Sequence, residues 1–264
     1  QMTPSLGKCL QRCLFCWRAT PSDLGVSWDQ LHLREGEAEN PSQIVEQCIE
    51  AHRIAISGFK GNPRVKPELI DLAMSPVHAA ISLEGEPTLY PYIGNLIEEF
   101  FSRGFKTVFL VTNGLNPEVL ANLSQEPSQL YISVVAPDEE TYNQVCRPLV
   151  SDGWRRLNET LELLGSFTAP TVLRHTLVKG LNLKNPERYA RLIAKANPTY
   201  VEPKAAMAVG FYRKRLTYGD MPWHSEIRAF AEELSKETGY TIVDESKDSE
   251  IVLMSRLQRP RRFE

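Results

Sequence analysis

Short apolar runs alternate with amphipathic segments along the first 204 residues. Each run is rich in β-branched residues and bounded by turn residues, which is typical of buried parallel strands. Six strands are predicted, at Thr3–Gly7, His78–Leu83, Thr107–Thr112, Leu130–Val135, Thr171–Val178 and Thr199–Lys204. The spacing of apolar residues predicts helices at Pro41–Phe59, Pro91–Arg103, Trp154–Ser166 and Pro186–Ala196. This alternation indicates an α/β fold with a parallel sheet.

The pattern changes after Lys204. Ala205–Pro222 has the Gly and Pro content of a loop, and Trp223–Glu237 is predicted to be an amphipathic helix. Thr241–Asp244 and Ile251–Ser255 are expected to form a terminal hairpin. We therefore divide the chain into a main domain, residues 1–204, and a C-terminal extension, residues 205–264.

Composition narrows the class of protein. The chain has 264 residues, is 42% hydrophobic and 24% charged, and carries a net charge of −3, which excludes a globally basic nucleic-acid binder but not a local basic patch. No apolar run is long enough to span a membrane, so no membrane partner is expected. Three of the five cysteines are clustered. Because disulfide frameworks spread paired cysteines along the chain, the cluster indicates a metal site in a reducing compartment, hence the cytoplasm.

The clustered cysteines, Cys9, Cys13 and Cys16, form a C-x3-C-x2-C motif after the first predicted strand. A structural zinc site needs four protein ligands, typically in two separated pairs, and no fourth cysteine lies nearby. Iron–sulfur clusters normally take four thiolates, so three would leave one iron open to a substrate. The spacing therefore favours an open iron–sulfur site. Of the other two cysteines, Cys48 is expected in the core and Cys146 in a loop.

This motif resembles that of the radical S-adenosylmethionine (SAM) superfamily. The resemblance implies that the three cysteines hold a [4Fe–4S] cluster and that SAM chelates its fourth iron. It further implies that an electron from the cluster splits SAM and that the resulting 5′-deoxyadenosyl radical abstracts a hydrogen atom. The implied fold is a partial (β/α)6 barrel, here with a C-terminal extension, and it agrees with the six predicted strands.

Further motifs resemble one family more closely. They are CLFCWR (13–18), GFKGNP (58–63), SLEGEPTLYP (82–91), FLVTNG (109–114), LYISVVAPDEETY (130–142), RPL (147–149), TLVKGLN (176–182), VEPKA (201–205) and MPWHSEI (221–227). Together they resemble the tRNA 4-demethylwyosine synthases in their shorter, flavodoxin-free archaeal form. This implies that N1-methylguanosine in phenylalanine tRNA is condensed with a two-carbon unit of pyruvate, with help from an electron donor. Two alternatives stay open: another radical SAM enzyme that modifies RNA or protein, and a zinc-stabilised RNA-binding protein.

The resemblance points to SAM-binding residues. Gly85, Glu86 and Pro87 match its SAM segment, in which the backbone and a carboxylate would bind the SAM amino group; the alternative is a simple turn. Asn113 would bind SAM through its amide, unless it only forms an Asn-Gly turn. Ser133 would face the barrel interior, or else be an ordinary core serine.

Substrate contacts are expected from basic residues. Lys179 and Lys204 are expected at the ends of the fifth and sixth predicted strands. Each is a candidate for contact with pyruvate or a tRNA phosphate; the alternative is a lysine exposed to solvent at the end of a strand. Arg213, Lys214 and Arg215 lie among aromatic residues, a combination that suits phosphate contact and base stacking. Trp223 and His224 are further candidates for contact with tRNA, although His224 equally suits a helix start.

The resembling family carries a second [4Fe–4S] cluster, held by three cysteines upstream of the first motif, and a lysine near them that is proposed to engage pyruvate. This chain begins eight residues before Cys9, so the ligands of that cluster are absent from it. We expect an N-terminal segment to be missing from the sequence, which leaves the pyruvate-handling residues unassigned.

Overall fold

The computed structural model describes residues 1–263 of the chain except 21, 22, 24, 26–35 and 37. Its strands form one seven-stranded sheet in the order β1-β2-β3-β4-β5-β7-β6. The first five pair in parallel, whereas β7 is antiparallel to both β5 and β6. The strands are β1 (His78–Ile81), β2 (Thr107–Thr112), β3 (Gln129–Ser133), β4 (Thr171–Leu177), β5 (Tyr200–Ala205), β6 (Thr241–Ser246) and β7 (Ile251–Ser255).

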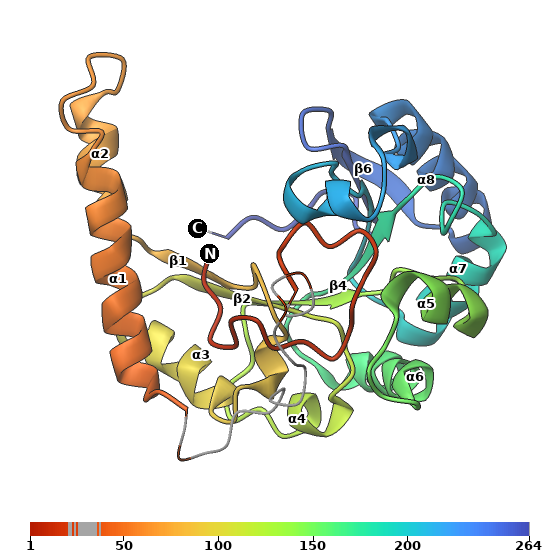
Figure 1. Cartoon of the computed structure of the whole chain (residues 1–264), viewed down its shortest axis with the longest axis horizontal. Helices are drawn as coiled ribbons and strands as arrows, with labels where there is room; N and C mark the ends of the chain where they lie inside the picture. Colours follow the sequence, from red (N-terminus) through yellow and green to blue (C-terminus); the bar gives the residue numbers. More distant parts are fainter. Residues whose placement is uncertain (21–22, 24, 26–35, 37, 264) are drawn as a thin grey trace.

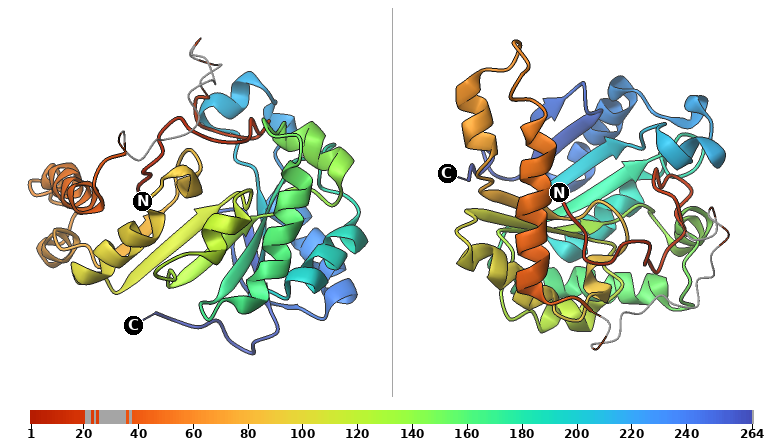
Figure 2. Two further views of the ribbon diagram at one scale, coloured as in Figure 1. Left: turned by 90° about the horizontal axis from the view of Figure 1, so that it is seen from below. Right: turned by 60° about the vertical axis from the view of Figure 1, so that its left-hand side comes forward.

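Helices follow the outer side of the curved sheet (Figures 1 and 2). The α-helices are α1 (Pro41–Ser57), α2 (Pro67–Ala73), α3 (Ile93–Ser102), α4 (Pro117–Ala121), α5 (Glu139–Cys146), α6 (Gly153–Leu163), α7 (Pro186–Ala196) and α8 (His224–Thr238). The short 3-10 helices are η3 (Pro87–Leu89), η4 (Leu164–Ser166), η5 (Gly210–Lys214) and η6 (Tyr218–Asp220). The N-terminal segment crosses one end of the sheet, as the left view of Figure 2 shows. None of the described helices is long and apolar enough to cross a membrane.

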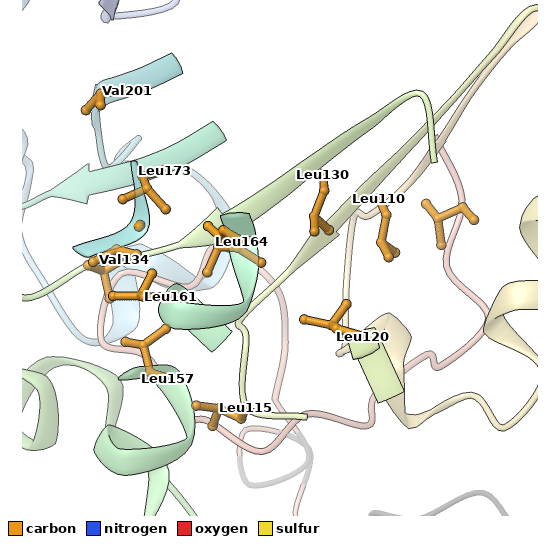
Figure 3. Packing of buried hydrophobic residues seen from close by; sticks show 14 of the residues in the cluster. Leu110, Leu115, Leu120, Leu130, Val134, Leu157, Leu161, Leu164, Leu173 and Val201 are labelled. Atoms are coloured by element: carbon orange, nitrogen blue, oxygen red, sulfur yellow. The ribbon is translucent and has the colours of Figure 1, made fainter. Parts of the chain in front are cut away.

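The core lies between the sheet and these helices (Figure 3). The strands contribute Leu110, Leu130, Leu173 and Val201, and the helices contribute Leu120, Leu157, Leu161 and Leu164, all of them buried. Burying one such side chain contributes about 1.5–3 kcal/mol. Because alternate strand residues point to the other face of the sheet, the concave side is left for a different set of side chains.

The partial-barrel prediction is confirmed, with one strand corrected. The strand predicted at Thr3–Gly7 is wrong, because these residues form no strand; only Met2, just before them, pairs with Ile81 through an isolated parallel bridge. Thr3 and Ser5 instead donate side-chain hydrogen bonds to carbonyl oxygens of the loop after β1. Pro4 also has no N–H to donate to a β-sheet hydrogen bond.

The other predicted strands, the four predicted helices, the C-terminal helix and the hairpin are all present, with ends shifted by a few residues. The short helices α2, α4 and α5 were not predicted. They have five to eight residues each, which is too short for a clear apolar period.

Candidate active site

A pocket of about 640 Å³ lies at the carboxyl ends of β2 to β5. Its walls include the three cysteines of the motif, the loop after β1, and the ends of these four strands. Open α/β sheets bind their ligands at this edge, where side chains from successive strands converge. The site-related lining residues are Cys9, Gln11, Cys13, Cys16, Trp17, Glu84, Gly85, Glu86, Asn113, Ser133, Arg174, Thr176 and Lys204.

The segment that carries the cysteines is paired with the end of α5. Arg12 N–H donates to the carbonyl of Cys146, and Leu14 N–H donates to that of Val145, each at 2.9 Å. Leu149 N–H in turn donates to the carbonyl of Leu10, also at 2.9 Å. These bonds satisfy two of the carbonyls that a helix leaves unpaired at its C-terminus, so α5 fixes the height of the cysteine loop above the sheet.

Arg215 holds the same loop from the other side. Its guanidinium donates hydrogen bonds to the carbonyl oxygens of Leu14, Cys16 and Arg18. It also forms an ion pair with Asp23 at 2.7 Å, in which both side chains are only 14% exposed. All three guanidinium nitrogens of Arg215 thus have partners within the protein, and its contact with tRNA stays a prediction.

The three thiols are close enough to influence one another. Burial and then the charge of Cys13 raise the pKa of Cys9, and the same two causes raise the pKa of Cys16 to about 11. For Cys13 the largest cause is a hydrogen bond with Cys146, followed by burial, and both raise its pKa. A positively charged centre is needed to stabilise three thiolates here, which suits the donor set of a cluster. Among the described residues, no three Cys, His, Asp or Glu side chains converge around the position of a single ion.

Cys146 was predicted to lie in a loop, and this prediction is wrong. It is the last residue of α5 and is fully buried. Cys48 packs against the main core cluster from α1, as predicted. The sequence places Cys146 before Arg-Pro, which suggested a loop, but the chain turns only at Arg147, whose backbone is left-handed.

The Gly85-Glu86-Pro87 segment supports the site from behind. Gly85 has a φ of +72°, and a Cβ there would lie 2.1 Å from the carbonyl oxygen of Ser5, so glycine is required by the crossing N-terminal segment. The Glu86 carboxylate is 1% exposed and accepts hydrogen bonds from the Thr112 hydroxyl, the Asn113 N–H, and both the N–H and the hydroxyl of Thr88. Its oxygens are thus engaged in joining the loops after β1 and β2.

The Glu86 carboxylate is thus engaged by groups of the protein, and its contact with a SAM amino group stays a prediction. Burial raises the pKa of Glu86, although its four hydrogen bonds oppose the shift. Pro87 is buried at the start of η3 and does not line the pocket. The sequence pattern could not show the bonds from Thr112 and Asn113 to Glu86, because these two residues lie at the end of another strand, β2.

Asn113 and Ser133 both line the pocket. The Asn113 side-chain oxygen accepts from Leu115 N–H at 3.0 Å, as in an Asn turn, while its NH₂ group points to the Cys9 sulfur at 3.9 Å. The two interpretations of Asn113 are therefore compatible, since one end of the amide forms the turn and the other faces the cysteines. Ser133 ends β3 on the concave side, in register with Arg174.

The two candidate lysines have different surroundings. Lys204 lines the pocket, and burial, followed by the charge of Arg174, lowers its pKa. Glu202, two residues earlier on the same strand face, pairs with Arg174. Lys179 instead forms an ion pair with Glu226 at 2.7 Å and does not line the pocket.

The remaining basic and aromatic candidates lie outside the pocket. Arg213 donates to the carbonyl of Ala208, and the Lys214 ammonium lies 4.4 Å from the centre of the Phe211 ring. Trp223 is 48% exposed and packs edge-on against Tyr218. His224 is mostly buried at the start of α8, 3.8 Å from Glu245, so its interpretation as a helix-start residue fits the structure better than tRNA contact.

Several residues that line the pocket were not among the predicted site residues, including Gln11, Trp17 and Arg174. Trp17 is 43% exposed at the rim, with the Arg18 guanidinium 3.7 Å above its ring. Arg174 had a usable signal, because a charged residue inside an otherwise apolar predicted strand seldom lacks a partner.

Comparisons with known proteins bear on both parts of the chain. The model for the radical SAM superfamily matches residues 3–193, and the model for wyosine base formation matches residues 195–256. The S-adenosyl-L-methionine-dependent tRNA 4-demethylwyosine synthase of Pyrococcus horikoshii is 50% identical over 260 residues, which cover 97% of this chain and 74% of that protein. The synthase of the same name from Methanocaldococcus jannaschii is 37% identical over 98% of this chain and 81% of that protein.

Two solved structures have folds similar to that of this chain. A structure of TYW1 with a lysine–pyruvate adduct bound superposes with a TM-score of 0.84 at 35% identity, covering 96% of this chain and 78% of that one. A crystal structure of archaeal TYW1 superposes with a TM-score of 0.72 at 32% identity, covering 86% of this chain and 74% of that one.

Proposed function

Because the chain belongs to the radical SAM tRNA 4-demethylwyosine synthase family, we propose that it modifies a guanosine of tRNA by radical chemistry. The observation that carries this proposal is the opening of three cysteine thiols into one pocket at the carboxyl ends of the parallel strands. The proposed location is the cytoplasm, a reducing compartment that keeps such thiols free.

The proposed cofactors are a [4Fe–4S] cluster on Cys9, Cys13 and Cys16, and SAM beside it. When bound, they supply one-electron chemistry, in which reduction of SAM yields a radical that removes a hydrogen atom. We assign SAM contacts to the Asn113 amide, which faces Cys9, and to Ser133 on the neighbouring strand. Gly85 and Glu86 contribute as supports of the pocket wall.

The proposed substrate is N1-methylguanosine in phenylalanine tRNA, condensed with a two-carbon unit of pyruvate to form 4-demethylwyosine. The names of the relatives support the product. Lys204 and Arg174 place positive charge in the pocket, which suits the carboxylate of pyruvate or of SAM. We assign no residue of this chain to a covalent pyruvate adduct or to a second cluster, and the electron comes from an external donor.

The C-terminal extension, residues 205–264, is the proposed tRNA-contacting part. Its exposed Tyr218 and Trp223 rings suit stacking with unpaired bases, and Lys214 suits phosphate contact. Lys179 is a weaker candidate, since Glu226 already neutralises it.

The proposal is tested on the anaerobically reconstituted protein. Phenylalanine tRNA carrying N1-methylguanosine is incubated with the protein, SAM, pyruvate and dithionite, and the digested nucleosides are analysed by mass spectrometry. The matched controls are tRNA with unmodified guanosine and the Cys13→Ala variant, which removes one cluster ligand.

Formation of 4-demethylwyosine only with the methylated tRNA and the wild-type chain supports the proposal. If SAM is cleaved but neither tRNA is altered, the chain acts on another substrate. If zinc is bound instead of iron and SAM is never cleaved, the proposed radical chemistry is refuted.

A further inference from the structure

Two arginines lie on the outer side of the pairing between the cysteine loop and the end of α5. Gln11 bridges to Pro148, and Arg12 N–H donates to the Cys146 carbonyl, so the two segments run side by side. Gln11 points inward, where its amide donates to the Tyr142 hydroxyl at 3.1 Å. Arg12, the next residue, is exposed and points to the opposite side.

Arg147 reaches the same side through an unusual backbone. Its φ of 47° is left-handed, which costs a residue with a side chain about 1–2 kcal/mol. This turn ends α5 and directs the chain back along the cysteine loop, with Leu149 N–H bonded to the Leu10 carbonyl. Strained non-glycine residues of this kind concentrate at functional sites.

Neither arginine is neutralised within the part of the chain that the structure describes. No carboxylate forms an ion pair with Arg12 or Arg147, whereas Arg155 and Arg156 on the following helix both pair with Asp152. The carbonyls at the end of α5 do not need the guanidinium groups either, because Arg12 N–H and Leu14 N–H already satisfy them. Both guanidinium groups are therefore available to an anion, in a protein whose net charge is −3.

The two arginines line a depression of about 540 Å³, together with Asn143, Pro148, Leu149, Val150 and Ser151. Its walls hold two guanidinium groups, one amide and one hydroxyl, and no carboxylate. Guanidinium groups form strong, bidentate hydrogen bonds with phosphate oxygens. The size and the donors of the depression suit one phosphodiester with its sugar.

We propose that the Arg12–Arg147 depression binds a backbone phosphate of the RNA substrate, next to the nucleotide that enters the pocket. Arg12 lies between Cys9 and Cys13, which line the pocket, so this phosphate sits on the far side of the cysteine loop from SAM. An enzyme that turns a base out of its stack needs such a grip on the neighbouring backbone. The inference rests on the proposed tRNA substrate and assigns a phosphate-binding role that is separate from the base pocket.

The test measures binding of a fluorescent anticodon stem-loop RNA to the reconstituted protein by anisotropy, over a range of KCl concentrations. Arg12→Ala and Arg147→Gly each remove one guanidinium, and glycine suits the left-handed φ of residue 147 without loss of backbone stability. Each variant should bind about tenfold more weakly and have a shallower slope of log affinity against log salt, by at most about 0.7, which is the value for the one phosphate that both arginines contact. The matched control is Arg155→Ala, which makes the same change in net charge on a nearby helix but removes an arginine already paired with Asp152 and Glu159.

Iron content and thermal melting establish that each variant is folded. If wild-type protein binds the RNA and both variants keep its affinity and salt slope, the phosphate site is refuted while the proposed function stands. Losses no larger than that of Arg155→Ala also refute it, since they reflect net charge alone. If the wild-type protein does not bind the RNA at all, the tRNA substrate itself is wrong and this inference fails with it.

Discussion

Replacing Arg215 by alanine removes one of the contacts through which the C-terminal extension holds the cysteine loop; the bond from Phe211 N–H to the Trp17 carbonyl remains. The guanidinium bonds three loop carbonyls, those of Leu14, Cys16 and Arg18, and pairs with Asp23. Hydrogen bonds to a charged group contribute about 1.5–3 kcal/mol each, and breaking a largely buried ion pair costs about 3–5 kcal/mol. The contacts share one side chain, so we expect a total near 4 kcal/mol rather than their sum.

The backbone bonds of Arg12 and Leu14 to the end of α5 remain in this variant, so we expect the loop to open locally more often while the rest of the fold stays intact. We expect Arg215→Ala to retain less than half of the wild-type iron after anaerobic reconstitution. The apoprotein should also be cleaved faster by protease within residues 9–20. Its global unfolding in urea should change much less. Arg215→Lys keeps the positive charge beside Asp23 but loses the planar guanidinium with its several N–H donors. Its iron content and protease sensitivity should lie between those of the wild type and Arg215→Ala.

Lys214→Ala is the matched control, because it removes an exposed cation from the adjacent residue without touching the loop. Wild-type iron content and unchanged protease sensitivity in Arg215→Ala would refute the role of Arg215 as a positioning residue. Equal losses in Lys214→Ala would do the same, because they would show that the charge of η5, and not the geometry of the clamp, supports the cluster.

Two further predictions concern the fold. Gly85→Ala should lower the free energy of unfolding in urea by about 2–5 kcal/mol, because of the left-handed φ and the clash with the Ser5 carbonyl. Gly239 has the same φ but open space around it, so Gly239→Ala should lower it by only about 1–2 kcal/mol. Equal costs would show that the clash is relieved elsewhere. Burial lowers the pKa of His175 from 6.5 to about 4. The neutral imidazole therefore contributes to the free energy of unfolding fully above pH 6.5. This contribution, about 3 kcal/mol, is lost as the pH falls from 6.5 to 4. In His175→Asn, the free energy of unfolding should therefore depend less on pH between pH 6.5 and 4 than it does in the wild type. An equally steep dependence in the variant would contradict this role of His175.

Local sequence patterns were sufficient for most of the architecture. Apolar runs such as Thr107–Thr112 predict β2 because a buried strand needs an unbroken apolar stretch, whatever its neighbours are. Pro186–Ala196 predicts α7 because its proline start and its apolar stripe lie within the helix itself. The spacing of Cys9, Cys13 and Cys16 likewise predicts a shared site, since one eight-residue stretch carries all three thiols to one pocket wall.

The surroundings of a polar side chain were not predictable where its partners lie far away in the chain. Glu86 was expected to face SAM, yet its carboxylate joins β1 to β2 through Thr112 and Asn113. Arg215 was expected to face tRNA, yet its partners lie about two hundred residues earlier, in the cysteine loop. A charged side chain has the same local signature whether it is solvated or clamps a distant loop.

The sequence by itself thus determined the elements, their order and the identity of the cysteine motif, because periodicity and spacing are properties of contiguous residues. Only the tertiary structure decided which polar groups remain available to a ligand. A polar group can make only a few hydrogen bonds or ion pairs. Glu86, Lys179 and Arg215 make theirs with partners within the protein. The side chains that instead face the pocket or the depression are Asn113, Lys204, Arg12 and Arg147. That division depends on distances between strands and loops, which no local pattern contains.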